Sequence, residues 1–353
     1  MTAATTTSAV CSLFLFTHVA FAGLEKYSSL VVADKYPYTE PPTDAVRVTY
    51  LGVNGFQFEI NGHALLVDPY FSRIGLWSAA LNQRIASNPN RVSEGLKHVR
   101  SRVDAILVTH AHFDHLLDAP EVMRRTQARL IAGPTAIRLV ESLEISPNEC
   151  DAVNAGSVRK IGPWRIRVFA AQHDRLFGKV PFQNCGSDQP SPQSSPSGRG
   201  SKKDFHALSS TPPSGRGRRK AAGEGELDKR PLKASDWCVG EPLAFVIEAA
   251  GKRIYIDSGG VLGSPPDAAV GNVDLAIVGV ALPDSRQRFA ETIRQLQPRY
   301  IFPSHQDDMF APFDRGFVFG KMTNFPTLLR KQGKEKLPGR VILLDYFRPW
   351  TLR

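Results

Sequence analysis

The sequence predicts an α/β protein, and three kinds of segment carry this prediction. Residues 105–108 are a run of four apolar, partly branched side chains, typical of a strand buried on both faces. Residues 164–172 largely alternate between apolar and polar, as a half-buried strand does. Residues 136–143 repeat apolar side chains at helical spacing, which favours a helix packed on a sheet. A polar cluster directly follows the first run, where α/β sheets expose functional loops.

The remaining elements follow from the same criteria in chain order. The domain opens with apolar and β-branched runs separated by short turns, which predicts a hairpin and a third strand. Alternating strands and helices come next, and a second series of strands with two more helices completes the domain. We expect strands at 46–52, 55–60, 63–68, 105–109, 129–132, 164–171, 242–249, 252–257, 274–280, 299–303 and 340–345, and helices at 118–127, 134–144, 287–296 and 324–332.

The polar cluster after residues 105–108 holds four potential metal ligands within six residues. His110 and His112 alternate, so they can converge on one ion if the segment stays extended. Asp114 and His115 follow an expected turn and can face a second ion. The alternative is a polar loop whose histidines serve unrelated structural roles.

This cluster resembles the His-x-His-x-Asp-His signature of the metallo-β-lactamase superfamily, and the match is complete. The resemblance implies a four-layer αββα sandwich with one or two metals at an edge of the paired sheets. It also implies a further His, an Asp and a His, each closing a strand. His173, Asp257 and His305 stand in that order, each at the end of an expected strand. The resemblance covers roughly residues 46–350.

The start of the domain and residues 305–312 look like one branch of the superfamily. That branch holds ascorbate-6-phosphate lactonase and N-acyl-phosphatidylethanolamine phospholipase D. Two departures stand out: Val53-Asn54 lies where many relatives carry a His soon after the first Leu-Gly, and residues 256–259 replace the usual Gly-Asp-Thr-Gly. The second departure keeps the ligand Asp257, but the substrate side could differ in both.

The resemblance also implies a division of the ligands between two divalent ions. One ion is expected at His110, His112 and His173, a second at Asp114, His115 and His305, with Asp257 bridging the two. Nitrogen and oxygen ligands without cysteine suit zinc, our first expectation, and also manganese or iron.

Three further roles are expected around these ligands. We expect Asp114 to be catalytic, orienting a hydroxide held between the metals and passing a proton to the leaving group. Asp68 is a candidate partner for the ring N–H of a ligating histidine, with a simple turn residue before Pro69 as the alternative. Arg175 and Lys179 could bind an anionic substrate, or be solvated charges.

We therefore expect a metallohydrolase that acts on a small ester, lactone or phosphodiester, preferably an anionic one. The alternatives are a non-catalytic metal-binding or scaffold protein on the same fold, or a nuclease-like member. Nucleic acid is a weak candidate: the net charge is +10, but ten Lys/Arg against six Asp/Glu in residues 183–236 account for four of those charges. No motif of a nucleic-acid-binding domain accompanies them.

The domain limits follow from composition. Residues 1–22 resemble an export signal, with a short apolar stretch before Ala20-Phe21-Ala22, although Met1–Ser8 contains no Lys or Arg. If that signal is real the protein is periplasmic or secreted; otherwise it is cytoplasmic. We expect a lead-in at 23–45, the catalytic domain at 46–350, a disordered basic insertion at 183–236, and no transmembrane segment. The oligomeric state is not predicted.

Overall fold

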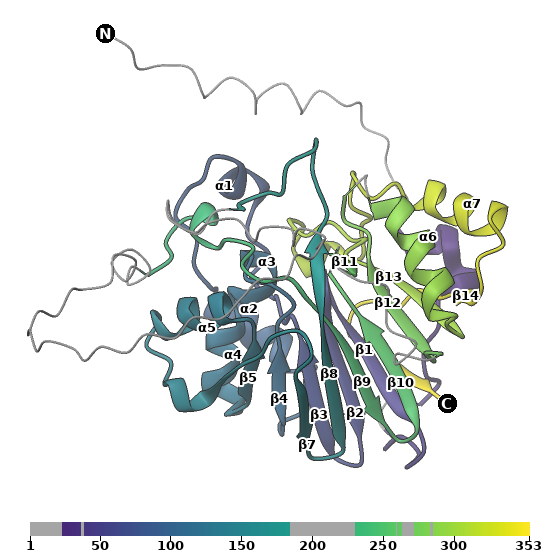
Figure 1. Cartoon of the computed structure of the whole chain (residues 1–353), viewed down its shortest axis with the longest axis horizontal. Coiled ribbons are helices and arrows are strands. Elements are labelled where there is room, and N and C mark those ends of the chain that lie inside the picture. The colour runs from purple at the N-terminus through teal and green to yellow at the C-terminus, as the bar shows by residue number, and fades with distance from the viewer. Residues whose placement is uncertain (1–22, 37–38, 184–229, 259, 263–271, 283–284) are drawn as a thin grey trace, which may run out of the picture.

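Two β-sheets packed face to face form the centre of the molecule, and helices cover both outer surfaces (Figure 1). A computed structural model describes residues 23–36, 39–183, 230–258, 260–262, 272–282 and 285–353. The predicted α/β class and the four-layer αββα arrangement are confirmed. The predicted export signal at 1–22 lies outside the described residues, as do residues 184–229 of the predicted insertion.

The first sheet has the strand order β15-β1-β2-β3-β4-β5-β6. Hairpins join β1, β2 and β3, β15 pairs antiparallel with β1 from the other end of the chain, and β3 to β6 run parallel because helices connect them. The strands are β1 (Val46–Gly52), β2 (Gly55–Ile60), β3 (His63–Val67), β4 (Ala105–Leu107), β5 (Arg129–Ala132), β6 (Cys150–Ala152) and β15 (Pro349–Leu352).

The second sheet has the order β11-β8-β9-β10-β12-β13-β14, with β7 paired to β8. Its strands β10, β12, β13 and β14 are parallel. The strands are β7 (Val158–Ile161), β8 (Trp164–His173), β9 (Leu243–Ala249), β10 (Lys252–Ile256), β11 (Gly260–Leu262), β12 (Leu275–Gly279), β13 (Tyr300–Ser304) and β14 (Arg340–Val341).

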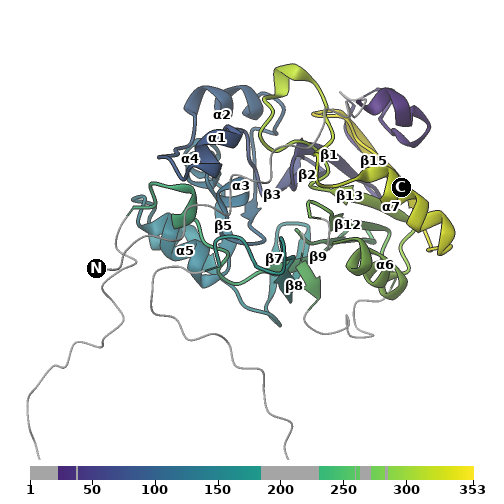
Figure 2. The ribbon, with the colours of Figure 1, turned by 90° about the horizontal axis from the view of Figure 1, so that it is seen from above.

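The helices divide between the two outer faces. Figure 2 shows α1, α2, α4 and α5 on the side of the first sheet and α6 and α7 on the side of the second. The helices are α1 (Leu76–Ala80), α2 (Pro89–Leu96), α3 (Phe113–Leu116), α4 (Ala119–Thr126), α5 (Pro134–Glu141), α6 (Ser285–Leu296) and α7 (Phe325–Lys334). Short 3₁₀ helices occur at Leu24–Leu30, Pro147–Glu149, Ala234–Asp236 and Phe313–Arg315.

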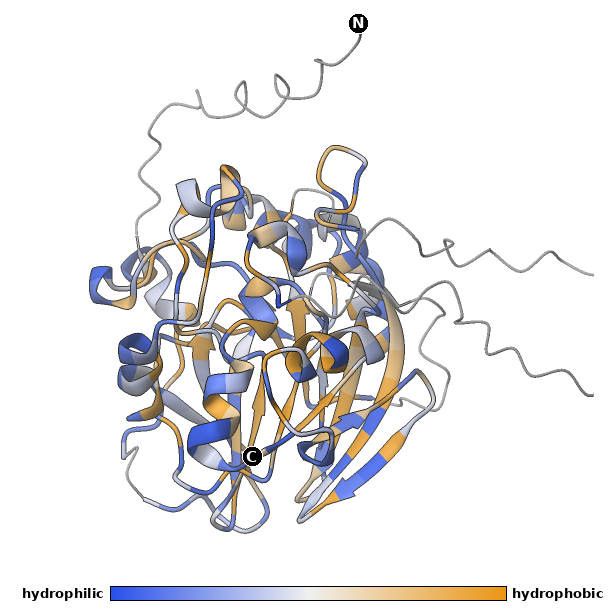
Figure 3. Ribbon diagram, turned by 90° about the vertical axis from the view of Figure 1, so that its left-hand side faces the viewer, coloured by the Kyte–Doolittle hydropathy of each residue, from blue (hydrophilic) through white to orange (hydrophobic). Residues whose placement is uncertain are grey.

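The alternation of side chains along β3 shows how one sheet serves two cores. Leu65 and Val67 pack into the cluster between the sheets, whereas Leu66 packs into the cluster beneath the helices of the first sheet. All three side chains are fully buried. Apolar segments accordingly line the interior strands, and hydrophilic segments lie on the peripheral helices (Figure 3). Because both faces are covered, this strand is apolar from Ala64 to Val67.

The expected strands and helices are present, most within two residues of their predicted limits. One clear correction concerns the last predicted strand, 340–345, which is limited to β14. The unpredicted elements are α1, α2, α3, β6, β7, β11 and β15. β15 extends to Leu352, because its residues pair with β1 and so complete the first sheet.

The segments flanking the domain are more structured than composition suggested. In the lead-in, Leu24 is buried in the larger hydrophobic cluster, and the Val32 N–H donates to the Leu343 carbonyl at 2.9 Å. Residues 230–236, the end of the predicted disordered insertion, are described and ordered, and Ala234 is fully buried there. The disordered limit at 236 was therefore set too late, since this segment packs onto the helical side of the first sheet.

No helix among the described residues is both long and apolar enough to cross a bilayer.

Candidate metal centre

The candidate centre lies where β4, β8 and β13 end at a common edge of the two sheets. His110 and His112 follow β4, His173 closes β8, and His305 follows β13. Asp114 and His115 lie on the short helix α3, which begins directly after His112. The structure gathers these residues into two triads, His110–His112–His173 and Asp114–His115–His305, with one candidate ligand atom per residue and all such atoms within 4.8 Å in each triad.

In the first triad, the histidine rings are oriented by their neighbours. His112 Nδ1 lies 3.0 Å from His110 Nε2, while the opposite nitrogen of His112 donates to the Pro181 carbonyl at 3.0 Å. His173 Nδ1 donates to the Asp174 carbonyl at 2.7 Å. A hydrogen bond on one ring nitrogen fixes the tautomer and leaves the other nitrogen as an acceptor. His112 Nδ1 and His173 Nε2 can therefore offer lone pairs to a cation.

Burial keeps these three rings neutral. It lowers the pKa of His112 to about 3 and that of His173 to about 4, with nearby histidines adding to the effect. The pKa of His110 is lowered well below its usual value, first by burial and then by His115 and His112. Neutral imidazoles are the form in which histidine binds a metal, so this triad is suited to a cation without prior loss of protons.

The second triad is organised around the Asp114 carboxylate. Asp114 Oδ2 lies 2.9 Å from His305 Nε2 and 3.3 Å from His115 Nε2. Burial opposes a charge on either partner, but their mutual attraction prevails: the pKa of Asp114 is held well below its usual range. Against the same burial, Asp114 and Asp68 raise the pKa of His115 to about 10. This triad thus offers an anionic oxygen that the first triad lacks.

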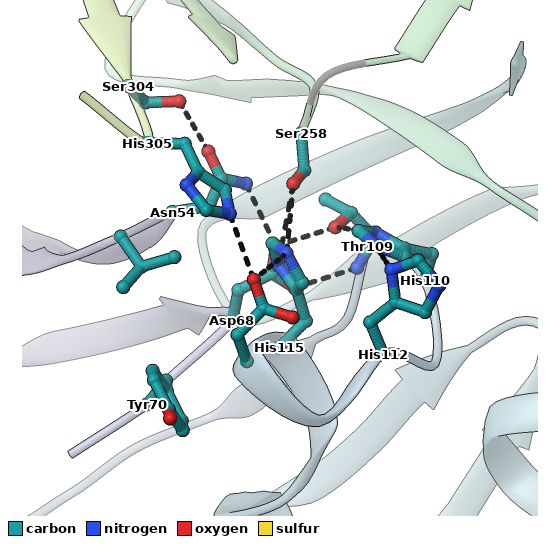
Figure 4. A network of polar contacts seen from close by, with 12 residues as sticks. Asn54, Asp68, Tyr70, Thr109, His110, His112, His115, Ser258, Ser304 and His305 are labelled. Carbon is teal, nitrogen blue, oxygen red and sulfur yellow. Dashed lines mark hydrogen bonds and ion pairs between the residues drawn. The ribbon is translucent and has the colours of Figure 1, made fainter. Parts of the chain in front are cut away.

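Asp68 connects the triads to the sheet beneath them, and the contact predicted for it is present. Its Oδ2 accepts from His115 Nδ1 at 2.9 Å, as Figure 4 shows. Thr109 donates its backbone N–H to Oδ1 at 2.8 Å and its hydroxyl to Oδ2 at 2.6 Å. Asn54 Nδ2 donates to the same carboxylate at 2.8 Å, and Asn54 Oδ1 accepts from the Ser304 hydroxyl at 2.5 Å. Thr109 precedes His110 and Ser304 precedes His305. The buried carboxylate of Asp68 therefore links the neighbours of two expected ligands.

The bridging role that the sequence predicted for Asp257 stays a prediction. Its Oδ2 accepts from the Tyr255 hydroxyl at 2.8 Å, and its Oδ1 accepts from the Gly279 N–H at 2.9 Å. The guanidinium of Arg288 lies 3.2 Å from Oδ2, so the carboxylate belongs to neither triad. Ser258 faces the centre instead, with its hydroxyl 3.2 Å from His115 Nε2 (Figure 4).

Arg288 on α6 is the main residue near the centre that sequence reasoning missed. Its side chain is 4% exposed and binds Asp174 with two parallel hydrogen bonds of 3.0 Å. It therefore connects the residue after His173 with Asp257. Arginine is common in surface helices, so its type alone carried no signal. Arg175 and Lys179 are exposed on the loop after β8, and their anion-binding role stays a prediction.

The donors present fit divalent metal ions. Each triad supplies three nitrogen or oxygen donors, which leaves a coordination position open as catalytic metal sites require. The arrangement can hold two ions side by side, with Asp114 next to the space between the triads. The assignment of these residues as ligands remains a prediction, and so does the identity of the metal.

Comparison with known proteins gives matches to metal-dependent hydrolases. Residues 47–187 match the model of the β-lactamase superfamily domain. A UPF0173 metal-dependent hydrolase of Methanopyrus kandleri is 37% identical over 86 residues, which cover 24% of this chain and 30% of the relative. One from Rubrobacter xylanophilus is 33% identical over 128 residues, covering 36% of this chain and 46% of the relative.

The fold is shared with a solved structure over nearly the whole molecule. Igni18, a metallo hydrolase from the archaeon Ignicoccus hospitalis, superposes with a TM-score of 0.51 at 16% identity, over 88% of this chain and 99% of that one. At this identity the likeness concerns the fold alone. The matched stretches span less than half the length of the two curated relatives described above.

Proposed function

We propose that this protein, which has the metallo-β-lactamase fold and carries a β-lactamase superfamily domain, is a metal-dependent hydrolase. The observation that carries the proposal is the convergence of two three-residue donor sets from three strand ends and α3. The names of the curated relatives support the same class of activity. A purely structural metal site would close its coordination sphere, whereas three donors per ion leave room for water and substrate.

Divalent ions bound at both triads would supply Lewis acidity, activating a water molecule and polarising the scissile bond. The residues of the chain then transfer protons and hold the histidine ligands in the required orientation. Asp114 Oδ2 lies next to both His115 and His305, and we assign it to accept a proton from the attacking water and return it to the leaving group. Asp68 keeps His115 in one orientation through its 2.9 Å hydrogen bond, and the Pro181 carbonyl does the same for His112 at 3.0 Å.

For the substrate, we propose a small anionic ester, lactone or phosphodiester. The likeness of residues 46–72 and 305–312 to the lactonase and phospholipase D branch supports this choice. Arg175 and Lys179 support it as well, since both are exposed directly after the ligand His173 and could attract an anion. Zinc is the proposed metal because imidazole nitrogens dominate the donors, and manganese or iron would suit the same set. Export of the protein is proposed from residues 1–22 alone.

The decisive experiment is a substrate screen of the metal-loaded protein, run in parallel with His115→Ala. Lactones, phosphodiesters, simple esters and β-lactams would be compared, each as a neutral and an anionic member. We expect turnover of an anionic lactone, ester or phosphodiester that His115→Ala abolishes. The double change Arg175→Glu and Lys179→Glu should raise KM for the anionic substrate and spare the neutral one. Turnover retained in His115→Ala would contradict the proposed centre, and a β-lactam as the best substrate would contradict the substrate class.

A further inference from the structure

Two adjoining hollows lie beside the loop that follows β3, apart from the metal centre. The larger, about 440 Å³, has the aromatic side chains of Phe71, His98, Phe313 and Phe347 in its wall. The smaller, about 220 Å³, is lined by Ser72, Arg84 and Asn88 among others. Arg73 and Arg91 line both. None of the seven predicted metal ligands lines either hollow, so their occupant need not touch the metals.

Arg73 is a buried cation behind the wall of both hollows. Its Nη1 binds Asp307 Oδ2 at 2.9 Å and the Asp308 carbonyl at 3.2 Å, and its guanidinium lies 4.2 Å from the centre of the Phe313 ring. Its Nε and Nη2 have no hydrogen-bond partner, although the residue is only 1% exposed. These atoms are sealed from solvent and Nη2 lies against Gly52, so Arg73 acts on an occupant of the hollows through its charge and not through hydrogen bonds.

The two hollows differ in charge. Three arginines line the smaller one, with no Asp or Glu among its lining residues. Arg91 also braces the wall, because its Nη1 donates to the carbonyls of Ser72, at 2.5 Å, and Arg73, at 3.0 Å. The larger hollow includes Glu94 and Asp314, both exposed, and Glu94 is already paired with Lys97 at 2.7 Å. The smaller hollow is therefore lined by positive side chains. The larger hollow has side chains of both signs beside an aromatic wall.

We propose that these hollows form one binding site for an amphipathic organic anion. Its carboxylate or phosphate would lie between the exposed side chains of Arg84 and Arg91, since guanidinium groups bind such anions through paired hydrogen bonds. Its apolar part would lie along Phe71, Phe313 and Phe347. An apolar wall that supplies contact area, with a few polar groups that fix orientation, is the usual design of a small-molecule site. This proposal goes beyond the hydrolase activity and does not depend on it.

The test uses the full-length, metal-loaded protein and hexyl phosphate as the probe. Two half-probes serve as controls: hexanol has only the apolar chain, and inorganic phosphate has only the anionic group. Binding is followed by calorimetry and by the fluorescence of Trp77, which is 62% exposed on α1 beside the smaller hollow. We expect hexyl phosphate to bind at least about tenfold more tightly than either half-probe, because only it uses both ends of the site. The double variant Arg84→Gln/Arg91→Gln should weaken its binding about tenfold or more.

Two controls distinguish this site from general charge attraction and from binding at the metals. Arg165→Gln/Arg294→Gln removes the same charge at exposed positions elsewhere and should leave the binding of hexyl phosphate unchanged. Phosphate groups also bind metals, so the titration is repeated after chelation, where the component that depends on Arg84 and Arg91 should persist. Its loss on chelation, or equal weakening by both double variants, would overturn the proposal. Binding only to vesicles that contain phosphatidic acid, and not to the monomeric probe, would overturn it too.

Discussion

Arg288 contacts none of the three histidines of the first triad, yet it holds together two strand ends at the centre. It reaches from α6 to Asp174 at the end of β8 and to Asp257 at the end of β10. Its side chain is 4% exposed, and those of Asp174 and Asp257 are 5% and 0% exposed. Charges buried this deeply persist only when they are paired, so the three groups stabilise one arrangement of the strand ends.

Replacing Arg288 should therefore cost far more than replacing an exposed arginine of the same helix. Arg288→Met leaves two buried carboxylates without their cation, and we expect a loss of about 3–5 kcal/mol in the free energy of unfolding. Arg294→Met is the matched control, since Arg294 is 49% exposed and pairs with Glu335; its loss should stay below about 1 kcal/mol. Urea denaturation measures both. Similar values for the two variants would mean that the buried ion cluster does not hold in solution.

A second prediction concerns metal content. His110→Ala removes a ring whose Nε2 lies 3.0 Å from His112 Nδ1, and we expect it to lower bound metal by at least one ion per chain and to abolish hydrolysis. His98→Ala is the control, because His98 is exposed and stacks on Phe347 away from the triads. Elemental analysis of both purified variants, at matched folding by circular dichroism, gives the answer. Unchanged metal in His110→Ala would remove His110 from the ligand set.

At the residue scale, the sequence was most informative where a motif is local. The triads draw on the compact motif of His110 to His115 and on two strand-end histidines, and the structure brings all of these together. Asp257 was harder, because its contacts with Gly279 and Arg288 come from elements distant in the sequence. Arg288 carried no signal, since its partners are 114 and 31 residues away in the sequence.

At the scale of single elements, α2 packs closely against the loop after β3 because Gly95 has no side chain. A Cβ added at Gly95 would lie 2.1 Å from the ring of Phe71, which is fully buried. Gly333, at the corresponding second-to-last position of α7, would place a Cβ in open space. The same substitution at these two glycines should therefore have opposite effects.

We expect Gly95→Ala to destabilise the protein by about 1–3 kcal/mol, because the added methyl group would overlap the Phe71 ring and force it from its position. Gly333→Ala should stabilise it by up to about 1 kcal/mol, since alanine favours a helix and restricts the unfolded chain. Thermal unfolding of both variants at one protein concentration compares them directly. Two shifts of the same sign would show that α2 does not pack on Phe71 as described.

The elements that sequence reasoning missed are short or depend on distant partners. The helices α1 and α3 have five and four residues, too few for a periodic apolar pattern. β15 has four residues, and its partner β1 lies at the opposite end of the domain. Long, periodic elements such as β1, β8 and α6 were predicted because their own residues determine them.

At the scale of the whole molecule, bound metal should link the two sheets and so stabilise the folded state. The candidate ligands come from β4 and α3 on the first sheet and from β8 and β13 on the second. A ligand present at about 100 times its Kd and bound only by the native state stabilises it by about 2.7 kcal/mol per site. We expect chelation to lower Tm by several degrees and re-addition of metal to restore it. In His110→Ala the shift should be smaller, and an equal shift would place the stabilising metal elsewhere.

The pairing of β1 with β15 also has a consequence for synthesis on the ribosome. β1 begins at Val46, but its partner, which starts at Pro349, emerges some three hundred residues later. Until then one side of β1 offers unpaired backbone groups, and an open edge of this kind attracts other strands. The nascent chain must therefore be protected from aggregation throughout most of translation. A slow or stalled ribosome would prolong this exposure, so the yield of folded protein should depend on how quickly the last strand is made.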